Sequence, residues 1–570
     1  MTGPTFLVRQ FLKLRVAALS IAIPFVSQVA PAQESRTRGS DSIPTVPSSL
    51  VLVTSETIDR FRFDQLVTGV AGGQSLLLRS ASSLTRPATN PLRPVRLSAL
   101  TPQLLFVHNT AIPFSQNYGA LWAGKGLSTR TLVGFKLETP RVRLIFAPEL
   151  ISSENSDWII RPFPFDQHVP AIPPDRAGDG YVFPYYVASL WSIDQPLRFG
   201  KGPIRRFDLG QTTAMFATNR VDFGFSNENE WWGPGIRNAI VLSNNAPGFP
   251  HFFIRTAHPL STRFGLIEAR WLVGGLTESK FFDTVSTNNV RSLASVAATL
   301  QTAWDPNLSF GVARSVYSTA TGWGQVPWRW LDVLSRTADS GNATPQDPPG
   351  KVRKDQLFSL FARWVAPADG LEIYTEWART QLRLNLHDLL VRPNHTQAYT
   401  LGLQWRRPAW WGGAFRLQTE ITQMEQSATF RDLPQESWNM SARVIQGYTN
   451  RGEVIGASIG PGASSQWLAM DYVRPSWRFG GYVGRIRWNE DVHSTANFPV
   501  YQGYCNHDVT LYPGVRAASI SRLGTLTADV SFQNRENAFF ENDGGCPNVG
   551  IRRDIRNRGL SITFSPFDAH

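Results

Sequence analysis

The sequence predicts an all-β protein whose antiparallel strands close into a barrel, and composition, side-chain period and an export signal are the observations behind this prediction. The 570-residue chain is 42% hydrophobic and holds 19 Trp, 13 Tyr and 35 Phe, yet only 18% of its residues are charged, below the roughly 25% of soluble domains. Its 45 Gly and 39 Pro, spread along the chain, exclude a coiled coil. Its apolar content excludes disorder. Membrane-spanning helices need about 20 consecutive apolar residues, and the longest run, Val16–Val26, is shorter and interrupted.

The first 32 residues have the order of a secretory signal peptide. Basic Arg9, Lys13 and Arg15 precede the apolar run, and Ala30-Pro31-Ala32 follows it as an A-x-A site. Charge, a short apolar core and small residues in this order predict cleavage near Ala32 and export. The alternative, a buried N-terminal helix, is disfavoured because nothing amphipathic continues past Ala32.

Two cysteines, Cys505 and Cys546, occur in loop-like surroundings after the signal. In an oxidising compartment an even pair favours a disulfide, here a staple between two surface loops. Two free thiols are the alternative. No His or Cys lies at ligand spacing beside them, so we predict no metal site and no cofactor.

The chain between the signal and the strands divides into two parts. Residues 33–50 are rich in Ser, Pro and Thr and are predicted to be a linker. Residues 51–129 are predicted to form a small helical region. Ser55 is a candidate N-cap for a helix that begins at Glu56, and Gln74–Leu84 is a second candidate helix.

From about residue 130 the apolar period changes to two, which places alternate side chains on opposite faces of a strand. We therefore predict that residues 130–570 form the barrel. The clearest strands are Ile267–Val273, Leu371–Ala378, Ala398–Trp405, Phe415–Ile421, Leu526–Phe532 and Leu560–Ser565.

The second face of these strands is strongly polar, as the pairs Glu372/Glu376 and Arg416/Glu420 show. A soluble multi-sheet protein also alternates, but an outer-membrane barrel places its apolar face in lipid and its charged face in a wet lumen. We favour the outer-membrane barrel. At about 10 residues per strand plus connections, the chain allows about 16–18 antiparallel strands. The long connection 318–350 is predicted to be extracellular, because such barrels keep their periplasmic turns short.

The most distinctive stretch is Asn227–Gly235, which contains Glu228, Glu230 and a Trp-Trp-Gly-Pro-Gly turn. One interpretation is a carbohydrate subsite in which indole faces stack on sugar rings. The other is a conformational corner, in which Gly233 and Gly235 adopt positive φ and the two Trp pack the turn. The two glutamates also have the residue type of a glycosidase pair. Paired Glu on alternate strand positions is common in polar lumens, so we disfavour catalysis.

This stretch carries a resemblance to a known family. Glu230-Trp231-Trp232-Gly233-Pro234-Gly235, followed by Ser243-Asn244-Asn245, resembles the capsule-assembly Wzi family of outer-membrane proteins. Weaker similar segments are Ile193–Gly200, Leu371–Trp377, Gly447–Gly452 and Ile455–Gly462. The resemblance runs from about residue 50 to the C-terminus.

The resemblance implies a closed barrel of about eighteen strands with its helical region on the periplasmic side. It also implies a lectin-like role in holding exported capsule or exopolysaccharide at the cell surface. Its motif residues are Glu228, Glu230, Trp231, Trp232, Gly233, Pro234, Gly235, Ser243, Asn244 and Asn245.

Arginine dominates the basic residues, since only seven of the 56 Lys and Arg are Lys. Guanidinium forks bind the carboxylates of acidic polysaccharides, although codon bias explains the count equally well. Nucleic acid is excluded as a partner because the excess is dispersed and the compartment is wrong. The candidate polysaccharide-binding residues are Trp323, Trp328, Arg329, Trp330 and Arg416.

The predicted function is therefore a non-enzymatic outer-membrane barrel that binds or anchors surface polysaccharide, with outer-membrane lipid as its surroundings. The first alternative is an outer-membrane channel for anionic solutes or oligosaccharides, which the polar face and the formal charge of +12 favour. A secreted glycan-processing enzyme is the second alternative.

Overall fold

The computed structural model describes residues 50–70, 74–85, 95–158, 193–283, 285–335, 352–380, 386–427, 436–491, 507–540 and 554–566. The signal peptide, nearly all of the linker and both Cys505 and Cys546 lie outside these residues. The elements are α1 (Glu56–Thr68), β1 (Leu78–Ser80), α2 (Ala81–Leu84), β2 (Arg96–Ala99), β3 (Gln103–Asn109), β4 (Gly126–Leu132), β5 (Phe135–Glu138), β6 (Val142–Phe146), β7 (Glu149–Ser153), β8 (Ile204–Asp208), β9 (Thr213–Ala217), β10 (Val221–Ser226), β11 (Glu230–Trp232), β12 (His251–Thr256), β13 (Leu260–Thr262), β14 (Gly265–Thr277), β15 (Val290–Thr302), β16 (Leu308–Ala320), η2 (Trp323–Gln325), η3 (Pro327–Leu334), β17 (Lys354–Ala366), β18 (Leu371–Thr380), α3 (Leu386–Val391), β19 (Gln397–Ala409), η4 (Trp410–Gly412), β20 (Gly413–Gln423), β21 (Thr449–Asn450), β22 (Glu453–Val454), β23 (Ser464–Arg474), β24 (Trp477–Arg487), β25 (Val509–Ser521), β26 (Gly524–Glu536), η6 (Ala538–Phe540) and β27 (Ile555–Pro566).

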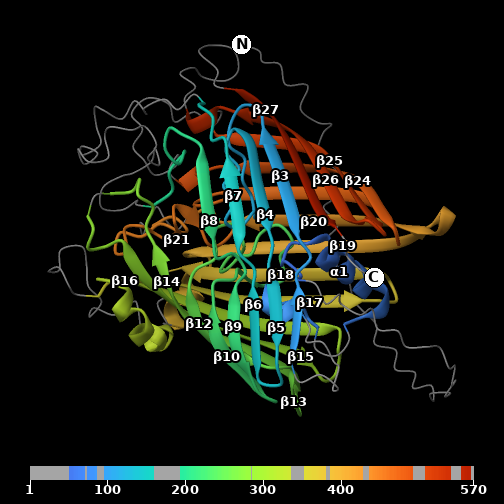
Figure 1. The fold of residues 1–570 in the computed structure, drawn as a ribbon, viewed down its shortest axis with the longest axis horizontal. Helices are drawn as coiled ribbons and strands as arrows, with labels where there is room; N and C mark the ends of the chain where they lie inside the picture. The colour runs from blue at the N-terminus through green and yellow to red at the C-terminus, as the bar shows by residue number, and fades with distance from the viewer. Residues whose placement is uncertain are drawn as a thin grey trace, which may run out of the picture. The chain divides into compact units, whose positions relative to one another are not determined.

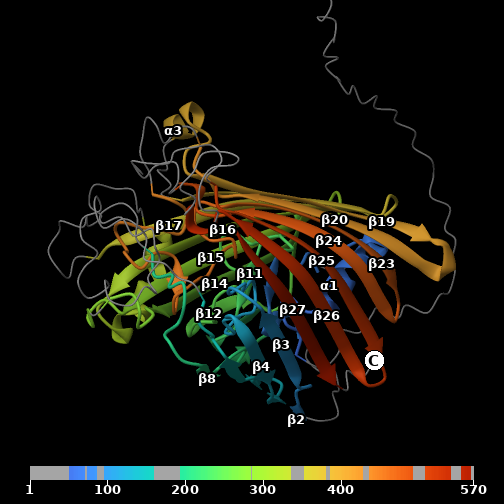
Figure 2. The ribbon, with the colours of Figure 1, turned by 90° about the horizontal axis from the view of Figure 1, so that it is seen from above.

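One large antiparallel sheet contains most of these strands (Figure 1). From β14 to β20 and from β23 to β27 each strand pairs with the next, and β20 pairs with β23. Figure 2 shows β23 to β27 following one another in this way. The last strand, β27, pairs with β3, and Leu560 lies opposite His108. The hydrogen-bonded order thus joins the C-terminal strand to an N-terminal one.

The connections differ between the two ends of the strands. At one end, which we call the short-turn end, the breaks are as brief as 367–370, 475–476 and 522–523. At the opposite, long-connection end lie 278–289, 321–353 and 424–463. This asymmetry is typical of outer-membrane barrels, whose turns are short on one side and whose loops are long on the other.

The two faces of the sheet differ in polarity, as the alternation predicts. Glu420 and Arg416 on β20 are each 1% exposed, while Ile421 beside them is 41% exposed. The face that carries Glu420 also contacts α1 and the segment 227–250, and we call it the inner face. The outer face exposes large apolar side chains such as Leu401 and Leu468.

All six of the clearest predicted strands are confirmed. They lie within β14, β18, β19, β20, β26 and β27. Alternation along the sequence was enough to predict these strands, because each has one face toward the polar interior and the other on the apolar outer face.

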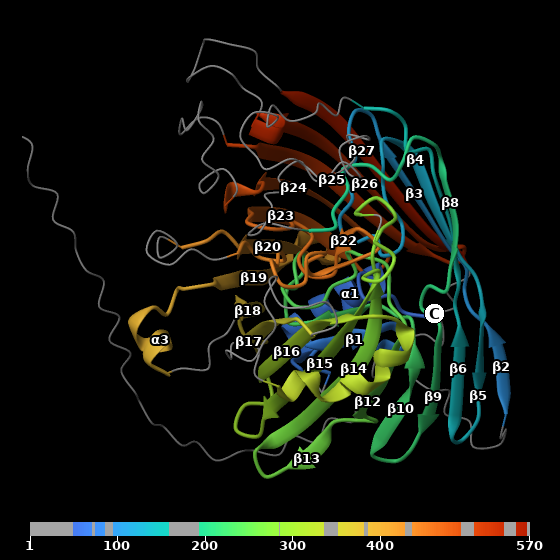
Figure 3. The ribbon, with the colours of Figure 1, turned by 90° about the vertical axis from the view of Figure 1, so that its left-hand side faces the viewer.

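Helix α1 is also confirmed from its predicted start at Glu56. Its N-cap, Ser55, makes no side-chain cap and instead donates from Oγ to the carbonyl of Leu52 at 2.8 Å. Figure 3 shows α1 and β1 among the strands of the sheet. Arg60 donates to the carbonyl oxygens of Arg474 and Pro475, so α1 lies at the short-turn end.

The second predicted helix, Gln74–Leu84, is wrong. Residues 78–80 form β1, which pairs with β11, and only the four residues of α2 are helical. The apolar period in this stretch reflects contacts with the sheet interior and not a helical face. The sheet also begins before residue 130, since β2 and β3 pair with β5 and β27.

Within the described residues, every helix is too short or too polar to cross a membrane.

Candidate functional site

The Trp-Trp-Gly-Pro-Gly motif forms a corner on the inner face. Trp231 and Trp232 lie on β11 and are 1% and 0% exposed. The Nε1 of Trp231 donates to the carbonyl oxygen of Gly235 at 3.2 Å. Gly233 has the expected positive φ, 106°, but the prediction of a positive φ at Gly235 is wrong. Indoles so deeply buried present no face to a sugar ring, so the geometry fits the conformational corner better than the carbohydrate subsite.

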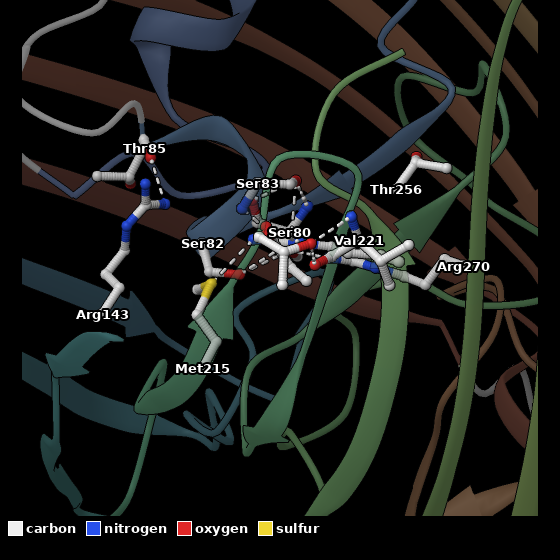
Figure 4. A network of polar contacts seen from close by, with 12 residues as sticks. Ser80, Ser82, Ser83, Thr85, Arg143, Met215, Val221, Thr256 and Arg270 are labelled. Atoms are coloured by element: carbon white, nitrogen blue, oxygen red, sulfur yellow. Dashed lines mark hydrogen bonds and ion pairs between the residues drawn. The ribbon is translucent and has the colours of Figure 1, made fainter. Parts of the chain in front are cut away.

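Glu228 and Glu230 are each bound by separate partners near α2. Figure 4 shows Ser80, Ser82 and Arg270 in this polar network. Glu228 accepts from the backbone N–H and the hydroxyl of Ser82, both at 2.7 Å. Glu230 forms an ion pair with Arg270, whose Nη2 also donates to Ser80 at 3.0 Å. Burial raises the pKa of Glu230 to about 7, although Arg270 acts in the opposite direction. These carboxylates thus join α2 and β11 to the sheet.

The Ser-Asn-Asn part of the motif joins the same segment to β22, to Gly456 after it and to Thr54 before α1. Ser243 donates from Oγ to the carbonyl oxygen of Gly456 at 2.6 Å. Asn245 donates from Nδ2 to the carbonyl oxygen of Val454 at 2.9 Å. Asn244 donates to the hydroxyl of Thr54 at 3.2 Å. All three side chains act inside the fold.

Glu420 anchors the turn that follows the motif, a role that sequence reasoning missed. Its carboxylate accepts the backbone N–H groups of Ile236 at 2.6 Å, Arg237 at 3.1 Å and Asn238 at 2.8 Å. The hydroxyl of Tyr374 donates to the same carboxylate at 2.8 Å. Because ionised acceptors form the stronger hydrogen bonds, Glu420 fixes residues 236–238 against β20.

A cavity of about 360 Å³ lies beside this segment on the inner face. Its wall follows three neighbouring strands, β26 over 525–533, β27 over 559–565 and β3 over 103–109, and is completed by the start of α1 and residues 114–118. Hydroxyl and amide side chains line much of it. They include Thr101, Gln103, Asn109, Gln116, Asn117, Thr525, Thr527, Ser531, Gln533, Ser561, Thr563 and Ser565.

The cavity is cationic. Its lining holds the arginines Arg62, Arg79, Arg130, Arg237, Arg478 and Arg516 against the carboxylates Glu56, Asp59 and Asp529. Three of these arginines are bound by carboxylates: Arg62 by Glu372, Arg478 by Glu56, and Arg516 by Asp471.

Arg79, Arg130 and Arg237 have no carboxylate ion pair among the described residues. Arg79 donates to the carbonyl oxygens of Gly233 and Gly235, and Arg130 to that of Tyr118. Within the described part of the chain, the Nε atoms of Arg79 and Arg130 are buried and lack a hydrogen-bond partner. Arg79 and Arg130 thus have an unused donor each, and Arg237, which donates to Gln116, carries a charge without a carboxylate ion pair among the described residues.

Aromatic rings stand beside these arginines. Tyr512 packs against Phe114 at a centroid distance of 5.5 Å and against Tyr482 at 6.2 Å, and all three rings line the cavity. The guanidinium of Arg237 lies 5.5 Å from the ring centroid of Trp467. The cavity thus combines guanidinium, aromatic and hydroxyl groups on one surface.

The candidate binding residue Arg416 lies outside this cavity lining. It is 1% exposed and forms ion pairs with Asp59 at 2.8 Å and Asp471 at 2.9 Å. Both bonds connect structural elements, so Arg416 has little capacity left for a ligand. The alternation of polar and apolar residues on β20 correctly predicted that the side chain of Arg416 faces inward, but it did not predict the ion pairs with Asp59 and Asp471.

The candidates Trp323, Trp328, Arg329 and Trp330 also lie elsewhere, on η2 and η3. The ring of Trp330 packs on that of Trp271 at a centroid distance of 5.3 Å, and Trp271 lies on the face of β14 opposite to Arg270. These residues therefore gather on the outer face, away from the cavity.

No family model matches the chain, and no curated protein matches its sequence. Among solved structures, the chain resembles Wzi of Escherichia coli, an outer-membrane protein involved in group 1 capsule assembly and described as a carbohydrate-binding β-barrel. The TM-score is 0.54 at 10% identity, over 91% of this chain and 99% of that one. OprB of Pseudomonas putida gives a TM-score of 0.33 at 11% identity over 82% and 94%. OccK7 (OpdD) of Pseudomonas aeruginosa gives 0.37 at 10% identity over 82% and 98%.

The likeness to Wzi shows the fold. This chain has the mostly antiparallel, all-β architecture of an outer-membrane barrel, with few helices.

Proposed function

We propose that this protein is a non-enzymatic outer-membrane barrel that binds acidic polysaccharide in its inner cavity and holds it at the cell surface. The observation that carries the proposal is the placement of Arg79, Arg130 and Arg237, without carboxylate partners among the described residues, in a cavity lined by aromatic rings and hydroxyls. Guanidinium forks bind carboxylates bidentately, and aromatic faces cover the apolar faces of sugar rings. Uronic-acid polymers present both groups in each repeat.

The membrane location rests on the polarity of the two faces. The outer face exposes apolar side chains on successive strands, while the charges are buried inside, as in a barrel surrounded by lipid. Wzi is described as an outer-membrane protein, which supports the proposed location, and as a carbohydrate-binding β-barrel, which supports the proposed ligand class. In this proposal the chain is exported by a cleaved signal peptide, and the short-turn end with α1 faces the periplasm.

The proposed barrel is closed and has about eighteen strands. Five pairs of consecutive segments then each count as one bent strand: β2 with β3, β4 with β5, β6 with β7, β8 with β9, and β12 with β13. The register supports this count, because β4 and β5 pair with β7 and β6, which are likewise consecutive.

Binding of a defined acidic polymer to the purified protein tests the proposal. We expect polygalacturonate to bind, neutral dextran not to bind, and added salt to weaken the binding, because salt screens the long-range attraction between a polyanion and the cationic cavity. Equal binding of both polymers, or of neither, would overturn the assignment of an acidic glycan.

A channel for anionic solutes is a second candidate. It is favoured because the cavity is elongated along the strands of the barrel wall, as a channel would be. Its lining on β26 extends from Thr525 to Gln533, which at about 3.4 Å per residue covers roughly 27 Å along the strand. Planar-bilayer recording separates the two functions. A binding barrel gives no open-channel current, whereas an anion-selective current blocked by polygalacturonate would favour the channel.

A further inference from the structure

The two 3-10 segments η2 and η3 lie on the outer face, over β14, β15 and β16. Figure 1 shows them as a yellow-green coil beside β14. The ring of Trp323 packs directly on Gly275 of β14. Beneath the coil, Ala294 and Val316 are each fully buried, although both point outward. On β16, by contrast, the outward Phe310 and Val312, further from the coil, are exposed.

The polar side of η3 faces the sheet. Asp332 accepts from the hydroxyl of Ser318 at 2.8 Å and from the Nζ of Lys354 at 2.7 Å. Arg314 donates from Nη1 to the carbonyl oxygen of Val333 and from Nη2 to that of Ser335, both at 2.7 Å. Arg314 thereby satisfies carbonyl groups that the end of a helix leaves without intrahelical partners.

The apolar side of η3 faces away from the protein. Trp328 is 82% exposed, Leu334 65% and Leu331 48%. A helix on the surface of a water-soluble protein buries its apolar stripe and exposes its polar one. In η3 the buried residues are Asp332 and Val333, whereas the larger apolar side chains of Trp328, Leu331 and Leu334 are exposed, an arrangement that apolar surroundings stabilise.

We propose that η2 and η3 form an interfacial anchor, whose outward side chains insert among the acyl chains of the membrane at the long-connection end. This inference rests on the proposed outer-membrane location. On the same outward face of β16, Phe310 and Val312 lie beyond Arg314 and are exposed, so a lipid layer around the sheet would cover them as well as the apolar side of η3. Trp residues favour such interfaces because their rings are amphipathic, and amphipathic helices lie in the interface plane.

The same observations disfavour a sugar site at these tryptophans. Recognition of sugar hydroxyls requires polar groups beside the rings, but Asp332 and the last carbonyl groups of η3 are bound by the sheet, and Arg329 can extend its guanidinium to the lipid headgroups from an interfacial helix. A lipid acyl chain requires no such partner.

Spin labelling of the full-length protein in phosphatidylcholine vesicles tests the anchor. Trp328→Cys and Leu334→Cys each carry a nitroxide, and collisions with oxygen, which partitions into lipid, are compared with those of a water-soluble nickel chelate. The aqueous control is Ser286→Cys, exposed in the neighbouring connection 278–289. The lipid control is Leu360→Cys on the outer face of β17, which is 46% exposed. Heat-modifiable gel migration confirms that each variant is folded.

We expect the oxygen-to-nickel accessibility ratio at 328 and 334 to exceed that at 286 severalfold and to approach that at 360. Ratios at 328 and 334 equal to that at 286, with 360 still protected from nickel, would overturn the anchor but leave the barrel location intact. Nickel access at 360 as well would instead overturn the outer-membrane location. Spin–spin broadening between labels at 328 would show a second copy of the chain on this face and would also overturn the lipid assignment.

Discussion

The Nη1 of Arg416 on β20 lies 2.8 Å from the Oδ2 of Asp59 on α1. Asp59 also lies 3.7 Å from the guanidinium of Arg478 on β24, and Arg478 in turn binds Glu56. Two acidic residues in the first turn of α1 thus face two arginines of the inner face. This network fixes the helix to the wall of the cavity.

Asp59→Asn should loosen α1. Removing Asp59 leaves Arg416 with Asp471 and Arg478 with Glu56, so the compensation of these buried charges is reduced and the link to α1 is lost. Because Asp59 retains 26% side-chain exposure, we expect a loss of about 1–3 kcal/mol in the free energy of unfolding. Urea unfolding in detergent and proteolysis of residues 50–70 measure it. Asp64→Asn, on the exposed side of the same helix, is the matched control, and an equal loss there would contradict the role of the ion pair.

Acid should release the same helix. Burial acts to raise the pKa of Asp59, but Arg416 and Arg478 together hold it well below its usual range. A lowered pKa in the folded state means that the stabilisation is complete above the ordinary Asp pKa of about 3.9 and declines progressively as the pH falls from there toward the lower pKa of the folded state. Proteolysis of residues 50–70 should therefore begin below about pH 4 in the native protein. Asp59→Asn should show the same susceptibility at every pH.

Glu420→Ala should destabilise the turn 236–238 by leaving three backbone N–H groups without their acceptor. Each hydrogen bond to a charged group contributes about 1.5–3 kcal/mol, so we expect a loss of about 3 kcal/mol or more and faster amide exchange at Ile236, Arg237 and Asn238. Glu420→Gln keeps one oxygen acceptor and should lose less. Thr419→Ala, on the opposite face of β20, should leave the exchange unchanged.

Arg237→Gln should weaken binding of polygalacturonate under the proposed function. Loss of a charge-assisted bond costs about 1.5–3 kcal/mol, which corresponds to roughly 10–100-fold in Kd. Arg237→Lys keeps the charge but not the fork and should be intermediate. Arg522→Gln, exposed in the turn 522–523 outside the cavity lining, is the matched control. If it reduced affinity as much as Arg237→Gln in a folded protein, the cavity would not be the binding site.

Asp491 should make the long-connection end sensitive to pH. Burial, with Glu425 and Glu490 nearby, raises its pKa to about 7, while it accepts from the backbone N–H of Gln426 and from Ser437, both at 2.6 Å. A raised pKa in the folded state means that the stabilisation is complete below the unfolded pKa of about 3.9 and is lost as the pH rises through about 7.

Between pH 5 and pH 8 the native protein should therefore lose a few kcal/mol, at most about 4, and Asp491→Asn should flatten this dependence. Thermal unfolding at a series of pH values measures it. Asp369→Asn, an exposed carboxylate in a short turn, should keep the native profile. An unchanged slope in Asp491→Asn would assign the dependence to other groups.

Sequence reasoning succeeded where the signal was local. The strands around Leu401 and Ile421 were predicted because each alternates between two environments, and helix α1 was predicted from a cap position followed by apolar spacing. It failed at Gln74–Leu84, where the apolar side chains pack against several different elements and β1 exists only because β11 lies beside it.

For the site, the sequence identified the correct segment but not its role. The Trp-Trp-Gly-Pro-Gly stretch is distinctive, yet burial of both indoles makes it a corner of the fold. No sequence motif marks Arg79, Arg130 and Arg237 as a group. They come from β1, β4 and the segment 227–250, and no pattern within one strand connects them.

The sequence by itself determined that one face of each strand is apolar and the other charged, because a period of two is a property of the local backbone. Only the tertiary structure decided which charged side chains are held in ion pairs within the protein and which remain able to bind a ligand. Asp59 meets Arg416 and Ser82 meets Glu228 across separations of 357 and 146 residues, and such pairing depends on how the strands are arranged. For the same reason, only the structure showed that the tryptophans of η3 face outward while its aspartate faces the sheet.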